Sequence, residues 1–360
     1  MKKVGLALVG ALIGAAALVG GCDSDDDGDQ TPVVAPDLSA ARSSAIDEDI
    51  LPAVRLFVDQ VQALQGAVQS LCAQPTVAGL ESTREAWRLA TRDWNGVLPY
   101  NLGPLDDDLI YPAVMFVESK RPRGADYTQT VRETLSAAVS SSVALDASYF
   151  DALTFNRVGL LALEVGLFET AATGTTAVGA VLTELQAQPR KCAFLVGVGA
   201  RLKTRAESIL AGWTVSFEDG LPFSEQLRSG SLSTGSGSVA ALTVAWVEYL
   251  DYVKRRKLET TLDGQISGYA YPPMKAGIEA LSAFLGESGD ATSFLSVLVA
   301  EGYEAEVTAV RTTLADTLAH LDAKERDLLI ADYAALENFL RGTFTAGLQL
   351  NLGVTFSDGD

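Results

Sequence analysis

The stretch that decides the fold is "IDEDILPAVRLFVDQVQALQGAVQSL", residues 46–71. Its apolar residues recur at steps of three and four, as Ile50, Val54, Phe57, Val58, Val61, Leu64, Val68 and Leu71. This spacing places all of them on one side of an α-helix. The stretch therefore predicts a long amphipathic helix with one buried face.

The same periodicity continues through most of the chain. It recurs over 79–98, 128–145, 157–170, 190–213, 237–258, 272–286, 291–320 and 324–349. Strand-like alternation between paired hairpin turns is missing from the sequence. The pattern predicts an all-α fold.

The helical pattern breaks at "EDGLPFSEQLRSGSLSTGSGS", 218–238, where glycine and serine are frequent. We therefore predict two bundles of about four helices each, at 45–217 and 239–360, joined by this Gly/Ser loop.

The N-terminus has the pattern of an export signal. Lys2 and Lys3 precede the apolar run "VGLALVGALIGAAALV", and small residues come immediately before Cys22. The segment "LVGGC" resembles the bacterial lipobox, in which the cysteine is lipidated. We predict a lipoprotein signal at 1–21, lipidation of Cys22 and an acidic, proline-containing tether at 22–44. The alternative is an uncleaved membrane anchor, for which the apolar run is short.

These features place the protein in the bacterial cell envelope, lipid-anchored and facing the periplasm, with inner and outer membrane both open. The chain of 360 residues has 46 acidic and 27 basic residues, for a formal charge of −19. Such an excess of acid repels phosphate backbones, so we exclude a nucleic-acid partner. The two remaining cysteines, Cys72 and Cys192, form either a disulfide or two buried free thiols.

The chain lacks the residues of common hydrolytic sites. A zinc peptidase of the usual kind needs two histidines, and this sequence has only His320. His320 lies four residues after Asp316, so the two either share a metal or lie solvated near a helix end. The sequence also lacks a Gly-x-Ser-x-Gly nucleophile motif.

A family resemblance centres on "GLLALEVGLF", residues 159–168. This segment resembles the signature of the imelysin-like family, Gly-x-His-x-x-Glu on a helix. Four further segments resemble the family in order and spacing: "TREAWRLATRDWNGVLPYNLGPL" (83–105), "CAFLVGVGARLKTRAESILAGW" (192–213), "YLDYVKRRKL" (249–258) and "LGVTFSDGD" (352–360). The resemblance covers about residues 45 to 360 and is carried by the combination of these segments.

The resemblance implies a helical fold of two four-helix bundles in an envelope protein that is often attached by lipid. It also implies either a peptidase, as the founding member was described, or a protein of iron acquisition whose signature His and Glu bind metal. Gly159 and Glu164 match the signature, but Leu161 occupies the histidine position and offers no ligand atom. A metal site would then need oxygen ligands from elsewhere, for which the candidates are Asp106, Asp107, Asp108 and Tyr111.

Glu164 itself has two interpretations, because a carboxylate in an apolar helix needs a partner. In the structural one it pairs with an arginine, the candidates being Arg84, Arg88, Arg92 and Arg157. In the functional one Glu164 lines a cleft with Trp87, Trp94 and Arg157, for a ligand other than a His-bound metal.

We therefore expect a non-catalytic binding or accessory lipoprotein, with iron or another divalent cation as the implied ligand. An imelysin-type peptidase and an envelope interaction scaffold are the alternatives. The expected partners are the membrane, through the lipid anchor, and a metal ion or an envelope protein.

Overall fold

Helix α2 (Leu51–Ala73) forms over the stretch that carries the first periodic pattern, and it buries the predicted apolar face. The computed structural model describes residues 35–119, 124–232, 237–286 and 292–353. In it α1 (Ser39–Ser44) and the π-helical turn η1 (Ala45–Ile50) lead directly into α2. The last residues of the predicted tether are thus helical, and Ala41 is buried against the core.

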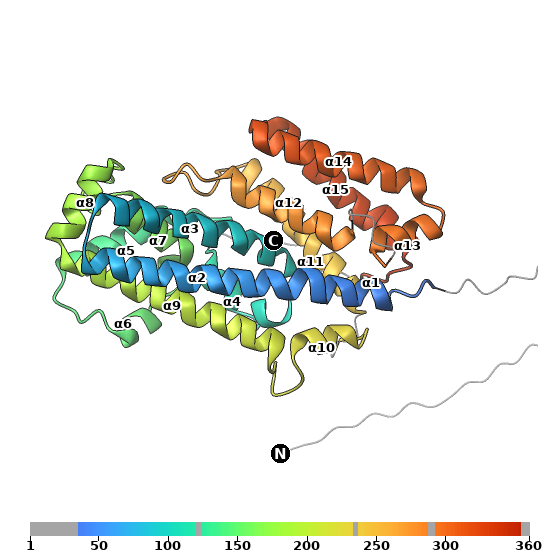
Figure 1. Cartoon of the computed structure of the whole chain (residues 1–360), viewed down its shortest axis with the longest axis horizontal. Coiled ribbons are helices and arrows are strands. Elements are labelled where there is room, and N and C mark those ends of the chain that lie inside the picture. The colour runs from blue at the N-terminus through green and yellow to red at the C-terminus, as the bar shows by residue number, and fades with distance from the viewer. Residues whose placement is uncertain (1–34, 120–123, 233–236, 287–291, 354–360) are drawn as a thin grey trace, which may run out of the picture. The chain divides into compact units, whose positions relative to one another are not determined.

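The first half of the chain forms the helices that surround α2. They are α3 (Val77–Val97), η2 (Leu98–Tyr100), η3 (Gly103–Leu105), α4 (Ala113–Val117), α5 (Thr128–Ser140), α6 (Ala147–Asp151), η4 (Phe155–Arg157), α7 (Gly159–Phe168), α8 (Val178–Ala187) and α9 (Pro189–Thr214). Helix α2 packs between α3 and α9, and α7 packs on both α3 and α9 (Figure 1).

The second half begins with a short helix inside the predicted Gly/Ser loop. Its elements are α10 (Phe223–Arg228), α11 (Ser238–Tyr252), η5 (Val253–Leu258), α12 (Tyr271–Leu285), α13 (Phe294–Ala300), α14 (Glu304–Ala323), α15 (Arg326–Phe339), η6 (Leu340–Phe344) and α16 (Thr345–Gly347). The predicted helix 291–320 is divided at Gly302, whose φ of +89° ends α13 before α14 begins. No strand occurs in the described residues, so the predicted all-α class is confirmed.

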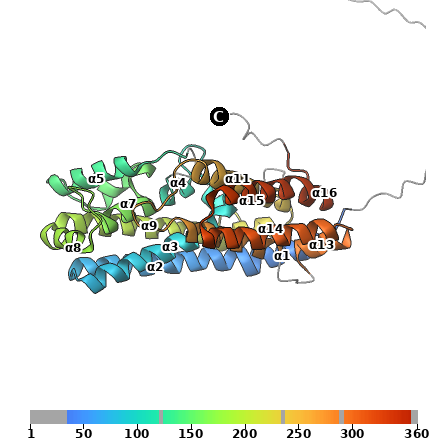
Figure 2. The ribbon, with the colours of Figure 1, turned by 90° about the horizontal axis from the view of Figure 1, so that it is seen from above.

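The helices of the two halves pack directly on one another. Helix α12 lies against α3, and Trp246 of α11 meets Tyr100 of η2 edge to face at 5.4 Å between ring centroids. The chain from Pro36 onward forms one compact unit. Figures 1 and 2 both show the continuous α1–α2 run extending from the α8 end to the α13 end. The division into two four-helix bundles stays a prediction.

Two sequence features have clear positions in this fold. Cys72 at the end of α2 forms a disulfide with Cys192 at the start of α9, with 5.3 Å between the Cα atoms. His320 of α14 pairs with Asp332 of α15, with 2.6 Å between Nδ1 and Oδ2. This hydrogen bond raises the pKa of His320 and joins the two helices. His320 is therefore a helix-pairing residue, and Asp316 makes no bond to it.

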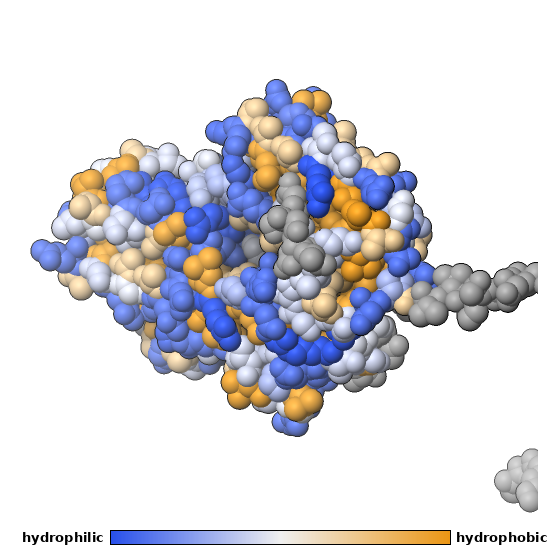
Figure 3. Space-filling model, turned by 45° about the vertical axis from the view of Figure 1, so that its right-hand side comes forward, coloured by the Kyte–Doolittle hydropathy of each residue, from blue (hydrophilic) through white to orange (hydrophobic). Residues whose placement is uncertain are grey.

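Several predictions fall on other parts of the chain. The signal at 1–21, Cys22, the tether up to residue 34 and residues 354–360 of the terminal segment lie outside the described residues. Within the described ranges, no helix combines the length and the apolarity that a membrane crossing requires. The surface mixes hydrophilic and hydrophobic residues on the face that Figure 3 shows.

Removing the disulfide tests its contribution to the fold. The bond joins residues 120 positions apart, so the unfolded chain loses considerable freedom when it is closed. We expect replacement of both Cys72 and Cys192 by serine to lower the free energy of unfolding in urea by about 2–4 kcal/mol. The controls are the wild type with the disulfide intact and the wild type after treatment with a reductant. Equal stability of all three samples would contradict this role.

Candidate functional site

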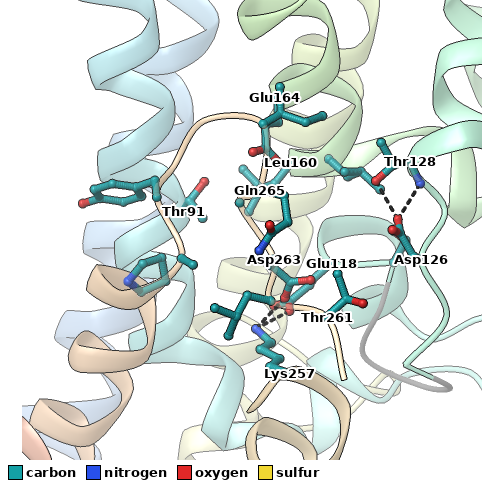
Figure 4. A pocket seen from close by; sticks show the side chains of 18 of the residues that line it. Thr91, Glu118, Asp126, Thr128, Leu160, Glu164, Lys257, Thr261, Asp263 and Gln265 are labelled. Atoms are coloured by element: carbon teal, nitrogen blue, oxygen red, sulfur yellow. Dashed lines mark hydrogen bonds and ion pairs between the residues drawn. The ribbon is translucent and has the colours of Figure 1, made fainter. Parts of the chain in front are cut away.

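A cavity of about 230 Å³ lies between α3, α4, α7, the start of α12 and the loop at 259–270 (Figure 4). Its volume is below the range of roughly 300–1,000 Å³ that is usual for drug-sized ligands. It therefore suits a small occupant. Its lining residues from the first half of the chain include Trp87, Thr91, Trp94, Asn95, Glu118, Asp126, Arg132, Leu160, Leu161 and Glu164. Those from the second half include Lys257, Leu262, Asp263, Gln265, Ile266, Tyr269 and Met274.

The two tryptophans of α3 form one wall of the cavity. The Trp87 indole N–H donates to the carbonyl oxygen of Leu160 at 2.9 Å, and the Trp94 indole N–H donates to Glu118 Oε2 at 2.8 Å. Both side chains are buried. Because both N–H groups are engaged, each ring offers only its carbon framework to the cavity. The tryptophans thus hold α3 against α7 and the end of α4 and also line the site.

Glu164 has one carboxylate oxygen bonded and the other open. Its Oε1 accepts from the Ser267 amide at 3.0 Å and from the Ser267 hydroxyl at 2.7 Å. Its Oε2 makes no hydrogen bond to any described residue. The side chain is 3% exposed and lines the cavity. One oxygen therefore anchors the 259–270 loop, while the carboxylate as a whole borders the cavity.

Burial raises the pKa of Glu164 to about 7, and the two bonds from Ser267 offset only part of this effect. The charges of Asp263 and Glu169 raise the pKa further. At neutral pH the carboxyl is thus divided between its neutral and ionised forms. This explains how an acid without a basic partner is tolerated in the apolar helix α7.

A charged network lies at the other end of the cavity. Glu118 Oε1 is 2.6 Å from Lys257 Nζ and accepts from the Tyr252 hydroxyl at 2.6 Å. Lys257 Nζ is also 3.0 Å from Asp263 Oδ2. In the view of Figure 4, Glu164 and Lys257 lie at opposite ends, with Gln265 and Asp263 between them. The network joins α4 and α11 with η5 and the 259–270 loop.

The ion pairs fix the protonation states of this network. Burial alone would raise the pKa of Glu118, but Lys257, Tyr252 and Trp94 hold it below its usual range. Burial alone would lower the pKa of Lys257, but Glu118 and Asp263 raise it above its usual range. Both groups are therefore charged near neutral pH.

Acidic groups outnumber basic ones around the cavity. The acids among the lining residues are Glu118, Asp126, Glu164 and Asp263, and the bases are Arg132 and Lys257. Arg132 donates twice to Glu169, at 2.6 and 2.9 Å, and Lys257 is shared by two acids. Neither base is left to balance Glu164. The cavity consequently favours positive charge.

The 259–270 loop is shaped by glycine. Gly264 has a φ of +67°, and an added Cβ would lie 2.7 Å from the Tyr269 carbonyl oxygen. The Tyr269 amide donates to the Gly264 carbonyl at 3.1 Å, which closes the turn around Ser267. The loop is thus held at Asp263 by Lys257 and at Ser267 by Glu164.

The predicted pairing of Glu164 with an arginine is wrong. Arg84 donates instead to the Leu167 carbonyl at 3.0 Å and pairs with Glu81, so it does fasten α3 to α7, but through the backbone. Arg88 and Arg92 pair with the acids near them on α3. Arg157 is exposed and does not line the cavity. Ser267 and a raised pKa accommodate Glu164 instead.

Two of the aspartates proposed as replacement metal ligands stabilise a turn through hydrogen bonds to backbone amides. Asp108 Oδ1 accepts from the amides of Ile110 and Tyr111 at 2.7 and 2.9 Å, and Asp107 Oδ1 accepts from the Ala113 amide at 2.7 Å. Asp106, Asp107, Asp108 and Tyr111 are all outside the cavity lining. Across the described residues, no three His, Cys, Asp or Glu side chains gather closely enough to hold a metal ion.

The remaining signature positions divide between lining and packing. Leu161, at the histidine position, lines the cavity together with Glu164. Gly159 does not line it but begins α7 with a φ of +76°. A Cβ there would lie 2.6 Å from the carbonyl oxygens of Phe116 and Val117. The glycine therefore lets α7 start against the end of α4, next to Glu118.

Sequence reasoning missed most polar residues of the site, among them Lys257, Glu118, Ser267 and Asn95. Lys257 lies in the quoted segment "YLDYVKRRKL" and is buried, but the basic residues around it gave no periodic pattern that would have indicated this. Glu118 ends the apolar run "AVMFVE", where an acid after buried residues was a usable sign. Ser267 and Asn95 are ordinary polar residues whose role depends on contacts distant in sequence.

The fold and the site define an all-α protein with an acid-lined cavity between α3, α7 and the 259–270 loop. Residues 50–341 match the family model described as Imelysin. Since the match covers more than half of the chain, the protein belongs to the imelysin family. No curated protein matches this sequence.

Two solved structures have a similar fold. An imelysin-like protein from Psychrobacter arcticum 273-4 is 16% identical with a TM-score of 0.65, over 89% of this chain and 100% of that one. A putative iron-regulated protein A precursor from Parabacteroides distasonis ATCC 8503 is 14% identical with a TM-score of 0.64, over 88% of this chain and 97% of that one. At these identities the likeness shows the fold.

The raised pKa of Glu164 predicts a pH-dependent stability. The folded protein holds the proton up to about pH 7, whereas the usual value is 4.5, so its stability contribution is lost as pH rises between these values. Relative to Glu164→Gln, we expect the wild type to lose about 3 kcal/mol of unfolding free energy from pH 4.5 to 8. Urea unfolding of both proteins at the two pH values measures this. A constant difference between them would contradict the raised pKa.

Proposed function

We propose that this protein is a lipid-anchored, non-catalytic binding protein of the bacterial envelope whose cavity holds a positively charged ligand. The observation that carries the proposal is Glu164, a buried carboxylate that lines the cavity, has no basic partner among the described residues and keeps one oxygen free of hydrogen bonds. The acids that outnumber the bases around the cavity favour the same kind of ligand.

The positions of the polar groups support binding over hydrolysis. Ser267 lies within 2.7 Å of a carboxylate of raised pKa, which is the geometry of a nucleophile and its base. However, Ser267 is not among the residues that line the cavity, so its hydroxyl is not presented to an occupant. His320, the single histidine of the chain, also lies outside the lining.

The envelope location rests on the sequence around Cys22 and on family membership. One structural neighbour is described as a putative iron-regulated protein A precursor. We extend that association to this chain as an accessory role in the uptake of iron or another metal.

Calorimetric titration of the full-length protein tests the cavity. The probes are Fe²⁺, Ca²⁺ and 2-phenylethylammonium, each at pH 8, where Glu164 is mostly ionised. We expect at least one cation to bind, with an affinity about tenfold or more lower in Glu164→Gln, because the buried negative charge is lost.

The matched control is Glu306→Gln, which removes the same charge from an exposed position on α14. Equal weakening in both variants, or no binding of any probe, would overturn the proposed binding function. Hydrolysis of an unfolded protein substrate that disappears in Glu164→Gln would favour the peptidase alternative instead.

Replacement of Cys22 tests the anchor. We expect the full-length wild type, expressed in a bacterium, to be recovered with the membrane fraction and labelled by a fatty acid. Cys22→Ser should lose the label and leave the membrane fraction in a carbonate wash. A variant that stays in the membrane after the wash would indicate the uncleaved-anchor alternative.

A further inference from the structure

Two polar atoms of α3 lie buried by the cavity without a hydrogen-bond partner. Asn95 is 2% exposed and lines the cavity, and its Oδ1 has no hydrogen bond although its Nδ2 donates to the Thr91 carbonyl at 3.0 Å. The Thr91 hydroxyl, also of a lining residue, is buried and unpartnered as well. The accessible surface of each of these two oxygens is below 1 Å², so an occupant of the cavity does not reach either of them.

These two residues share a face of α3 with the tryptophans. Trp87, Thr91, Trp94 and Asn95 follow one another at steps of four, three and one, and all four line the cavity. Glu164 of α7 lines it too, with Oε2 free of hydrogen bonds. The open carboxylate oxygen of Glu164 is therefore the acceptor that this side of the cavity presents to a donor group.

The rest of the wall is apolar. Ring or aliphatic groups come from Trp87, Leu160, Leu161, Leu262, Ile266, Tyr269 and Met274. Trp87 and Tyr269 pack with 6.4 Å between their ring centroids, so they form a continuous aromatic surface from α3 to the 259–270 loop. Such a surface is complementary to a hydrocarbon body and, through its ring electrons, to a nearby cation.

We propose that the cavity binds a small primary amine, with its ammonium group at Glu164 Oε2 and its hydrocarbon body against the Trp87 and Tyr269 rings. An ammonium group donates N–H bonds and carries the positive charge that the open carboxylate oxygen favours. A calcium ion needs six to eight oxygen ligands, more than these residues supply. The inference rests on the proposed function and specifies the chemistry of its ligand.

Binding of this ligand is coupled to the proton of Glu164. An ammonium group favours the ionised carboxylate, so an amine that binds at neutral pH displaces the proton. Because the pKa of Glu164 lies at about 7, the ionised fraction rises about tenfold from pH 6 to pH 8. The affinity for the amine should rise by about the same factor.

The test compares three probes of nearly equal shape on the full-length wild type by calorimetry. 2-Phenylethylamine carries the ammonium group, 2-phenylethanol is its neutral counterpart, and 3-phenylpropionate carries a negative charge. We expect the amine to bind at least about tenfold more tightly than the alcohol at pH 8, and the propionate not to bind. We also expect proton release at pH 7, seen as a binding enthalpy that depends on the buffer.

Two variants examine the role of the Glu164 carboxylate. Glu164→Gln should abolish both the preference for the amine and the proton release, whereas Glu306→Gln should keep both. Equal affinity for amine and alcohol in the wild type overturns the inference without any variant.

The remaining outcomes separate the inference from the proposed function. If Fe²⁺ or Ca²⁺ binds in a manner that depends on Glu164 and the amine does not bind, the cation-binding function stands and the amine inference fails. If no probe binds, both fail.

Discussion

The ion pair between Glu118 and Lys257 is the interaction on which the site depends. It is buried, and it joins the end of α4 to η5, which lie in different halves of the chain. The Trp94 indole and the Tyr252 hydroxyl complete the hydrogen bonds of the acid. A buried pair is costly unless such partners satisfy it, and here the same partners also bring α3 and α11 into register. The cavity exists because these four elements meet at one carboxylate.

The substitution of the family histidine by Leu161 changes what Glu164 can do. An imidazole three residues before the acid would share a cation with it, whereas leucine leaves the carboxylate beside hydrocarbon. Burial in these apolar surroundings raises the pKa of Glu164 to about 7, so the acid carries a proton part of the time near neutral pH. The acid retains its position in the cavity through Ser267, which lies 103 residues away in sequence. The position of the acid and its protonation are thus set by different neighbours, Ser267 for the position and the apolar surroundings for the protonation.

Hydrophobic periodicity is enough to predict the helices here, because burial of α2, α3 and α9 follows the three- and four-residue steps closely. The family resemblance and the cleft hypothesis grouped Gly159, Leu161, Glu164, Arg157, Trp87 and Trp94, and of these Trp87, Trp94, Leu161 and Glu164 line the cavity. Periodicity could not identify Ser267 as the partner of Glu164, because a loop residue carries no periodic signal. Nor could it distinguish Arg84 bonded to a carbonyl from Arg84 bonded to the acid, since both choices leave the sequence pattern unchanged.

The Glu164 carboxylate bonds the 259–270 loop and also lines the cavity, and this couples the conformation of the loop to the occupancy of the cavity. Its Oε1 bonds Ser267, and the strength of that bond depends on whether the acid is charged. Any occupant that ionises the acid also tightens the loop that covers it. Occupancy of the cavity and the stability of the 259–270 loop are then thermodynamically linked through the protonation of Glu164.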